Sequence, residues 1–271
     1  MSARKARGLM SQLLVFGNEK GGAGKSTLSM HVACALLQSG AKVGILDLDL
    51  RQLTLRRFFE NRENFSQLYS PNLPVPTVGK IDPAEINTPE QHFNMITSQL
   101  LSTHDFVVID CPGALTKYSE LAHANANKLI TPMNDSFIDF DLLAYIDPET
   151  NAVKGPSIYS EMVWDARKAR SLSRGIPIDW IVARNRLSAT NMHNKRKVGE
   201  ALENLSKRIG FRLIPGLSDR VIFKELFPKG LTVADPSTLT KQPTTISNIA
   251  ARQELRDLMV GLKLPNFTIK F

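Results

Sequence analysis

A glycine- and lysine-rich run near the beginning of the chain constrains its fold more than any other feature. Residues 17–27 read GNEKGGAGKST, between a short apolar segment at 13–16 and a segment whose apolar residues recur at helical spacing. Strand, glycine-rich loop and helix in this order can bind phosphate, because glycines let backbone N–H groups approach phosphate oxygens and the helix N-terminus attracts anions. The sequence therefore predicts an α/β fold with a phosphate-binding loop.

The loop fits one version of the phosphate-binding pattern better than another. The general pattern G-x-x-x-x-G-K-[S/T] has a glycine where this chain has Glu19, whereas the variant K-G-G-x-G-K-[S/T] matches residues 20–26 at every position and adds Lys20. Lys25 would reach the β- and γ-phosphates, and the Ser26 hydroxyl would ligate Mg²⁺. We expect a nucleotide to be bound by the following residues: Gly21, Gly22, Ala23, Gly24, Lys25, Ser26 and Thr27.

Two later strands are predicted to end in acidic residues beside this loop. Residues 42–46 read as a strand followed by Asp47 and Asp49, and the apolar run at 106–109 ends in Asp110. One carboxylate near a bound nucleotide can help hold the Mg²⁺ shell, and another can orient the attacking water. We expect Asp47 and Asp110 to join Ser26 at the metal. The alternative interpretation is that these acids only cap the ends of their strands.

These motifs together resemble those of the ParA/MinD family of dimerising ATPases. The loop matches the family's deviant Walker A pattern, residues 47–52 match D-x-D-x-x-Q, and residues 106–113 match a strand followed by D-x-P-G. Longer stretches, at 18–27, 47–52, 131–141, 184–187, 219–221, 225–228 and 250–256, resemble the MipZ branch of this family. The resemblance runs from residue 13 to about residue 262 and implies a doubly wound, mostly parallel sheet flanked by helices.

The resemblance assigns further roles to individual residues. It implies ATP and Mg²⁺ as cofactors, a Lys20 that crosses to the nucleotide of a partner subunit, and an Asp49 that is needed for hydrolysis but not for ATP binding. Family members read the adenine edge with an Asn at the end of a later strand, and the amide of Asn185 is chemically suited to this task. Pro215 and Asp219 are expected to complete the base pocket.

Positive charge is concentrated in one part of the chain. The formal net charge is +8, and residues 167–212 contain twelve Lys or Arg and only three Asp or Glu. A charge excess this localised is typical of a surface that binds polyanions, and the absence of a base-reading motif favours DNA binding without sequence preference. An ordinary solvated helix face is the alternative. The candidate DNA-binding residues are Arg184, Lys195, Arg196, Lys197, Lys207 and Arg208.

Three regions are expected along the chain: a basic extension at 1–10, a single ATPase domain at 11–264 and a tail at 265–271. No apolar stretch is long enough to span a membrane, and the two cysteines form no disulfide or zinc pattern. The last amphipathic segment, at 250–262, has a polar face without net charge, whereas attachment to an anionic surface requires a basic face. A cytoplasmic protein without stable membrane binding is therefore expected.

The family resemblance also implies a function. An ATP-dependent homodimer that hydrolyses ATP slowly would bind DNA, inhibit polymerisation of the tubulin-like protein FtsZ and thereby position the division site. The centromere-binding protein ParB would recruit the monomer, so that the protein associates with the nucleoid and is enriched toward the cell poles. The alternative function is that of a ParA-type ATPase for chromosome or plasmid segregation.

Overall fold

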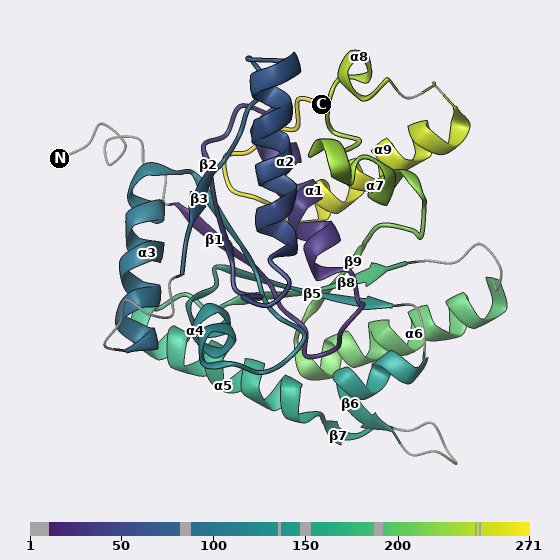
Figure 1. The fold of residues 1–271 in the computed structure, drawn as a ribbon. Coiled ribbons are helices and arrows are strands. Elements are labelled where there is room, and N and C mark those ends of the chain that lie inside the picture. The colour runs from purple at the N-terminus through teal and green to yellow at the C-terminus, as the bar shows by residue number, and fades with distance from the viewer. Residues whose placement is uncertain are drawn as a thin grey trace.

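The computed structural model describes residues 11–81, 88–134, 137–146, 153–186, 192–241, 243 and 245–271. At its centre lies a seven-stranded sheet with the order β3-β2-β4-β1-β5-β8-β9, in which every pairing is parallel (Figure 1). The strands are β1 (Gln12–Phe16), β2 (Val43–Asp47), β3 (Thr77–Gly79), β4 (Phe106–Asp110), β5 (Lys128–Asn134), β8 (Asp179–Asn185) and β9 (Arg212–Pro215). The predicted parallel α/β sheet is confirmed.

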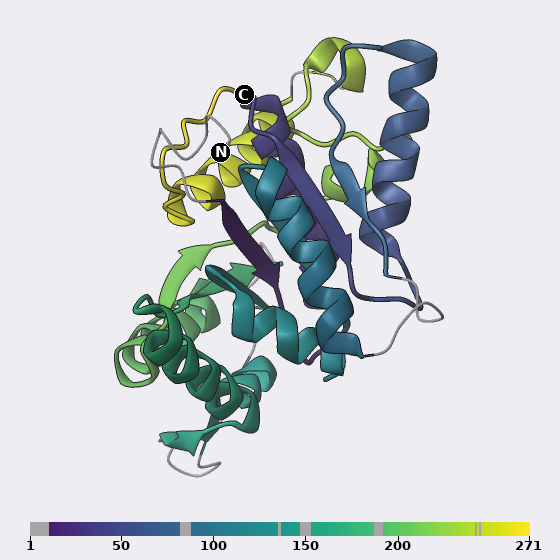
Figure 2. The same cartoon turned by 90° about the vertical axis from the view of Figure 1, so that its left-hand side faces the viewer.

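Helices cover both faces of the sheet and form two separate apolar layers. One layer contains α1 (Lys25–Gln38), α2 (Thr54–Tyr69), α7 (Ile222–Glu225) and α9 (Ile246–Gly261). The other contains α3 (Pro89–Thr103), α4 (Lys117–Asn125), α5 (Ile158–Arg174) and α6 (Met192–Ile209). Figure 2 shows α2 and α9 on the opposite side of the strands from α5. The fold is therefore doubly wound, as the sequence predicts.

The central strands are apolar on both faces because both faces are covered. In β4, Val108 packs with the first layer, and Val107 and Ile109 pack with the second. Alternation of this kind explains why parallel strands read as continuous apolar runs in the sequence. The remaining elements are α8 (Ser237–Thr240), the 3-10 helices η2 (Phe137–Leu142) and η3 (Phe227–Lys229), and an antiparallel pair, β6 (Ala144–Ile146) and β7 (Val153–Pro156).

Two features of the structure go beyond what the sequence indicates. Helix α2 extends to Tyr69, whereas apolar spacing indicates a helix only over 53–61, because its second half carries polar residues that include the fully buried Arg62. The tail at 265–271 packs onto the domain: Phe271 is 8% exposed, and the ring of Phe267 meets that of Phe106 edge-on at 5.8 Å. In the described part of the chain no helix is long and apolar enough to cross a membrane.

Candidate nucleotide-binding site

The sheet brings the three predicted motifs to one edge. In the strand register Phe16, the last residue of β1, lies opposite Asp110, and Asp110 lies opposite Asp47 on the other side. The glycine-rich loop leaves β1 at this edge, as expected for ligand sites in open α/β sheets. A cavity of about 670 Å³ opens here. It is lined by Gly21, Gly22, Gly24, Lys25, Ser26, Thr27, Asp49, Arg51, Gln52, Thr54, Cys111, Pro112, Gly113, Ala114 and Arg186.

The loop needs its glycines for conformation and for close packing. Gly22 and Gly24 adopt left-handed backbone conformations, with φ of 76° and 92°, which side chains disfavour. A Cβ atom on Gly113 would lie 3.1 Å from the Cα atom of Gly21, so the segment after β4 packs directly against the loop. The loop is thus built to expose backbone N–H groups to the cavity.

Lys25 is held inside the cavity rather than extended into solvent. Lys25 is 7% exposed, and its Nζ donates a hydrogen bond to the carbonyl oxygen of Lys20 at 2.9 Å. Burial lowers the pKa of Lys25, while the nearby carboxylates of Asp110 and Asp49 oppose that shift. A buried ammonium group among backbone N–H donors is a site for an anion such as a phosphate chain.

Asp110 is the most unusual ionisable group in the cavity region. It is completely buried, and neither carboxylate oxygen accepts a hydrogen bond of normal geometry from the described residues. Burial raises its pKa well above the usual range and the charge of Asp47 adds to this, whereas the nearby Ser26 hydroxyl and Lys25 lower it. Unsatisfied carboxylate oxygens beside a hydroxyl form a hard donor set that fits Mg²⁺.

The metal assignment of Asp47 has less support from the geometry. One of its oxygens accepts a hydrogen bond from the backbone N–H of Asp49 at 3.0 Å, and the other accepts one from Arg56 at 3.1 Å. Burial raises its pKa to about 6, and these N–H donors oppose the shift. Asp47 therefore shapes the turn that leads to Asp49. Of the residues described, no group of three or more His, Cys, Asp or Glu forms an all-protein metal site, so Mg²⁺ would take phosphate and water as further ligands.

Lys20 does not line the cavity of its own chain. Its Nζ lies 3.3 Å from Oδ1 of Asp139 on η2, and its backbone N–H donates to the side chain of Asn18 at 2.7 Å. The sequence predicts that this lysine serves a partner's nucleotide, and that role stays a prediction. The structure adds that Lys20 has an acidic contact within its own chain.

The three residues predicted to form the adenine pocket do not line the described cavity. Asn185 is buried, and its amide donates to the carbonyl of Ala23 at 2.8 Å and accepts from the backbone N–H of Leu217 at 3.0 Å. Asn185 thus braces the phosphate loop against the segment after β9, and its adenine-reading role stays a prediction. Pro215 and Asp219 are exposed and are not among the described residues that line the cavity; Asp219 pairs with Lys224 at 2.8 Å.

Comparison with known proteins agrees with this geometry. The sequence model of the family described as ATPase MipZ matches residues 12–266. The chain belongs to the MipZ family of ATPases. It is therefore an ATPase, and the predicted family is confirmed.

Relatives of this MipZ-family chain act in cell division and chromosome partition. The septum site-determining protein MinD of Thermotoga maritima is 24% identical over 255 residues, which cover 78% of this chain and 93% of that protein. The chromosome-partitioning ATPase Soj of Treponema pallidum is 25% identical over 160 residues, which cover 51% of this chain and 62% of Soj. The MipZ-family chain is therefore similar to proteins named for each of these two roles.

Solved structures share the fold of this MipZ-family chain. Apo McdA from Cyanothece has a TM-score of 0.63 and 15% identity, with 93% of this chain and 99% of McdA covered. MinD of Pyrococcus horikoshii, solved with Mg-ADP, has a TM-score of 0.58 and 17% identity, with 94% of this chain and all of that chain covered. At these identities the likeness establishes the doubly wound P-loop fold.

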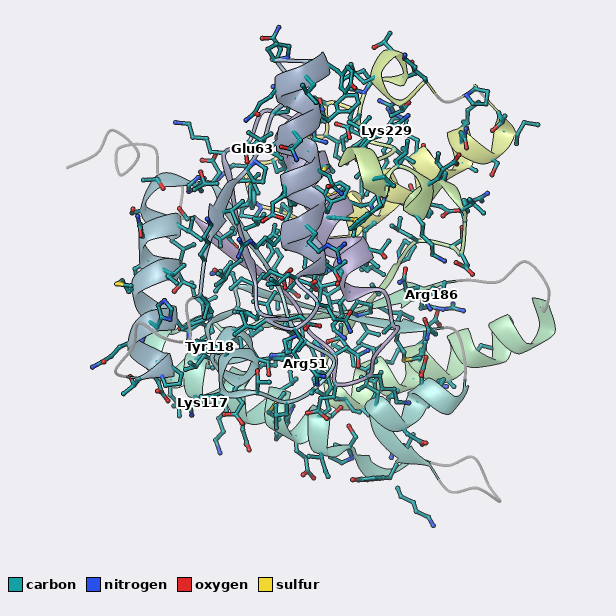
Figure 3. All side chains as sticks on the ribbon, viewed as in Figure 1. Arg51, Glu63, Lys117, Tyr118, Arg186 and Lys229 are labelled. Atoms are coloured by element: carbon teal, nitrogen blue, oxygen red, sulfur yellow. The ribbon has the colours of Figure 1, made fainter. Side chains whose placement is uncertain are left out.

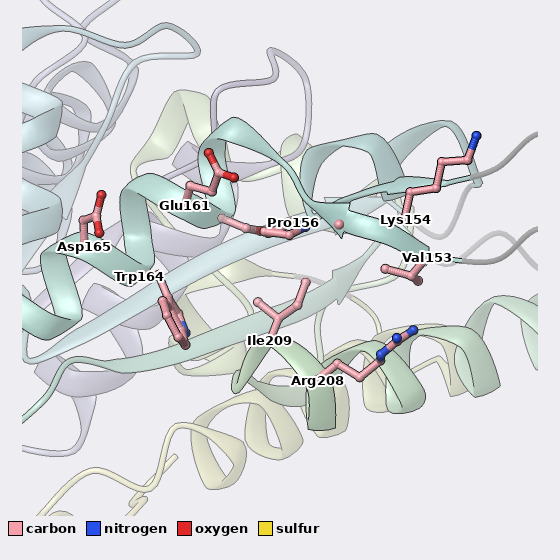
Figure 4. Close-up of a pocket in the computed structure, with 10 residues that line it drawn as sticks. Val153, Lys154, Pro156, Glu161, Trp164, Asp165, Arg208 and Ile209 are labelled. Carbon is pink, nitrogen blue, oxygen red and sulfur yellow. The ribbon is translucent and has the colours of Figure 1, made fainter.

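The candidate DNA-binding residues of this MipZ-family chain do not form one described patch. Arg184 is partly buried, and its guanidinium packs against Gly199 of α6. A Cβ atom added to Gly199 would lie only 2.9 Å from Nη1 of Arg184. Lys207 and Arg208 are exposed in the last turn of α6. Arg208 also lines a separate cavity of about 510 Å³ beside Trp164 (Figure 4). The side chains of Lys195, Arg196 and Lys197 lie outside the described residues.

Part of the basic excess at 167–212 is used inside the domain. Arg167 donates to the carbonyls of Ile178 and Gly210, and the buried Arg170 donates to the carbonyl of Asn125. Arg212 forms a two-point ion pair with Asp179, with distances of 2.9 and 2.7 Å. The regional count of charges therefore overstates the positive surface that this segment can offer to a polyanion.

Several residues of the site were given no role by the sequence analysis. Arg51, Gln52, Thr54 and Arg186 line the cavity with the loop, and Figure 3 labels both arginines. Beneath the loop, the buried Tyr159 of α5 donates a hydrogen bond from its hydroxyl to the carbonyl of Gly17 at 3.0 Å. Arg51 and Gln52 belong to the D-x-D-x-x-Q segment, which could have pointed to them. Tyr159 lies 142 positions from Gly17, so no local pattern could reveal it.

Proposed function

We propose that this chain is an ATP-dependent dimerisation switch that positions the cell-division site. The observation that supports this best is the place of Lys20. The motif requires this lysine, yet it contacts Asp139 instead of lining its own cavity as Gly21, Lys25 and Ser26 do. The nucleotide of a second copy would draw this cation away from Asp139, so ATP would join two copies with both nucleotides between them.

The chemistry of the cycle follows from the residues around the cavity. Lys25 and the backbone N–H groups of the loop hold the β- and γ-phosphates, and Asp49 orients the water that attacks the γ-phosphorus. Mg²⁺, when bound beside Ser26 and Asp110, neutralises phosphate charge. Slow hydrolysis removes the γ-phosphate, and with it the charge that attracts the partner's Lys20, so the dimer separates into monomers.

Sedimentation of hydrolysis-deficient protein tests the switch. We expect the Asp49→Ala protein to dimerise with ATP and to remain monomeric with ADP. Adding Lys20→Ala should abolish the ATP-dependent dimer, whereas adding Lys42→Ala should not. Lys42 is an exposed lysine that directly precedes β2, at the opposite end of the sheet from the cavity, and is therefore a matched control. Full dimerisation of the Lys20→Ala/Asp49→Ala protein would refute the cross-subunit role.

DNA binding by the dimer is part of the same proposal. Dimerisation doubles the basic surface, so the ATP-bound dimer should bind DNA far better than the monomer. The support is the exposed pair Lys207 and Arg208 at one end of α6, with 195–197 on the same helix. Binding should weaken steeply with salt and after charge reversal at Arg196 and Lys197. Binding that responds to neither change would refute DNA contact through this helix.

The target of the switch separates this function from the alternative. We propose that the dimer inhibits FtsZ polymerisation, that ParB recruits the monomer, and that the protein is cytoplasmic, nucleoid-associated and enriched toward the poles. The support is membership of the MipZ family. A segregation ATPase is the second candidate, favoured by the similarity to Soj. FtsZ sedimentation with and without the ATP-bound protein discriminates them: less polymer supports division-site positioning, and unchanged polymer supports segregation.

A further inference from the structure

The turn that follows β2 is fixed by hydrogen bonds at both of its ends. The carboxylate of Asp47 accepts from the backbone N–H groups of Asp49 and Arg56. The carboxylate of Asp49 accepts from the N–H of Gln52 at 3.1 Å, and its carbonyl accepts from the N–H of Leu53 at 2.8 Å. Leu53 itself adopts a left-handed conformation with φ of 49°. Such local strain persists where the surroundings define the backbone and is common at functional sites.

Arg51 occupies the middle of this fixed turn and lines the nucleotide cavity. Its neighbours Asp49, Gln52 and Thr54 line the same cavity. Arg51 is exposed, so its position there contributes nothing to the apolar core. The turn therefore presents a carboxylate and a guanidinium group, two residues apart, to one space.

Charge complementarity favours a phosphate contact for Arg51. Among the described lining residues the cations are Lys25, Arg51 and Arg186, and Lys20 is in contact with Asp139 outside the cavity. Arg186 follows β8, which lies four strands from β2 in the sheet, roughly 19 Å away at the usual strand spacing. Arg51 is consequently a second cation, in addition to Lys25, on the side of the cavity where Asp49 is placed to orient water. A guanidinium group matches phosphate oxygens in a two-point fork that an ammonium group cannot reproduce.

We propose that Arg51 is a catalytic residue that contacts the γ-phosphoryl oxygens of ATP bound in its own chain. In the reaction the water oxygen bonds to the γ-phosphorus, the bond from that phosphorus to the bridging oxygen of ADP breaks, and the water's proton leaves with the phosphate. Arg51 exchanges neither proton nor electron. It stabilises the negative charge on the equatorial oxygens as the bonds change. This inference rests on the proposed location of ATP in the cavity.

Steady-state and rescue kinetics on the full chain test this role. We expect Arg51→Ala to lower kcat by about 100-fold, the usual effect of losing one transition-state donor. KM for ATP should change by less than about threefold, since the lost contact strengthens only in the transition state. Arg51→Lys should lie between the parent and Arg51→Ala. Millimolar guanidinium ion should restore part of the Arg51→Ala rate and none of the Asp49→Ala rate, an outcome that a purely structural role would not produce.

The control is Arg57→Ala, which removes an exposed arginine of α2 that does not line the cavity, and it should keep the parent kcat. Thermal unfolding should be the same for all three arginine variants. A kcat within twofold of the parent in Arg51→Ala, or a raised KM with an unchanged kcat, would overturn the catalytic role while leaving the ATP site intact. A parent protein without ATP turnover would instead refute the proposed site itself.

Discussion

The domain buries charge in two places, and the two places differ in how that charge is compensated. Arg62 and Asp235 are each at most 1% exposed and form two hydrogen bonds of 3.0 and 2.7 Å with each other. The guanidinium also donates to the carbonyls of Pro74 and Gly230, and Asp235 accepts from Gln38. Asp110 is equally buried, but no described residue donates a well-formed hydrogen bond to either of its oxygens.

This contrast separates a structural charge from a functional one. A buried ion pair with all of its hydrogen bonds made holds elements together, here α1, α2 and the segment before α8. A buried carboxylate without donors costs stability in the free protein, and such groups are concentrated at functional sites. We infer that the Arg62 cluster is complete without a ligand and that the Asp110 region is completed by one.

The largest effect is expected at the complete cluster. Replacing Arg62 by Met leaves Asp235 buried without its cation, which should lower the free energy of unfolding by about 3–5 kcal/mol. The double variant Arg62→Met/Asp235→Leu should recover most of this loss because it removes both charges. Urea unfolding at pH 8 measures each variant, with the exposed Arg57→Ala as the control. A loss below about 1 kcal/mol in the single variant would show that the pair does not stabilise the fold.

Acid should destabilise the protein through two buried histidines, one near the Arg62–Asp235 pair and one near the phosphate loop. Burial lowers the pKa of His31, near Asp235, to about 4 and that of His123, beneath the loop, also to about 4. Both pKa values lie below the ordinary histidine pKa of about 6.5. The stability that the two neutral histidines contribute is therefore present above about pH 6.5 and is lost as the pH falls toward 4. Between pH 7 and pH 5 each histidine should remove about 1–2 kcal/mol. Urea titrations at both pH values should show this, with a shallower pH dependence in His31→Gln.

Removing the charge of Asp110 should raise the free energy of unfolding, whereas removing the charge of Arg62 should lower it. Asp110→Asn eliminates an uncompensated buried carboxylate, so the nucleotide-free protein should gain roughly 1–2 kcal/mol at pH 8. The same variant should lose most of its Mg²⁺-dependent ATP turnover because a metal ligand is removed. Thermal unfolding and turnover are measured on the same preparation. If Asp110→Asn is less stable than the parent, Asp110 stabilises the fold as the Arg62–Asp235 pair does, and the proposed contrast is wrong.

The smallest effect on stability is expected at the contact between Lys20 and Asp139. The Lys20 side chain is 35% exposed, so Asp139→Asn should change the free energy of unfolding by less than about 1 kcal/mol. Dimerisation in the Asp49→Ala background should nevertheless require less ATP, because Asp139 no longer competes for Lys20. Sedimentation against ATP concentration measures this. An unchanged ATP requirement would mean that Asp139 does not restrain the lysine.

The cavity was predictable from the sequence because its residues occur in short motifs at strand ends. The loop, Asp47, Asp49 and Asp110 lie where parallel-strand topology requires them, and the continuous apolar run of β4 predicted a buried central strand. Arg62 was not predictable. Its partner Asp235 is 173 residues away, and a charged residue in a helix normally indicates a solvent-facing side.

Long-range pairing also explains which contacts the sequence could not supply. The brace from Asn185 to Ala23 joins residues 162 positions apart, so the sequence could supply the amide but not its partner. Counting charges over 167–212 treated Arg170 and Arg212 as surface residues, whereas backbone carbonyls and Asp179 engage them. Composition records how much charge a segment has and not which contacts use it.

Single-turnover hydrolysis by Asp49→Ala protein, measured together with its affinity for ATP, shows whether ATP is hydrolysed at this edge of the sheet. Asp49 is partly exposed, and its carboxylate accepts the N–H of Gln52 within the turn, so its removal affects that turn but should leave the sheet and the phosphate loop intact. We expect the variant to bind ATP as tightly as the parent and to form ADP at least about 100-fold more slowly. Hydrolysis at the parent rate, with ATP bound, would contradict the assignment of catalysis to this edge of the sheet.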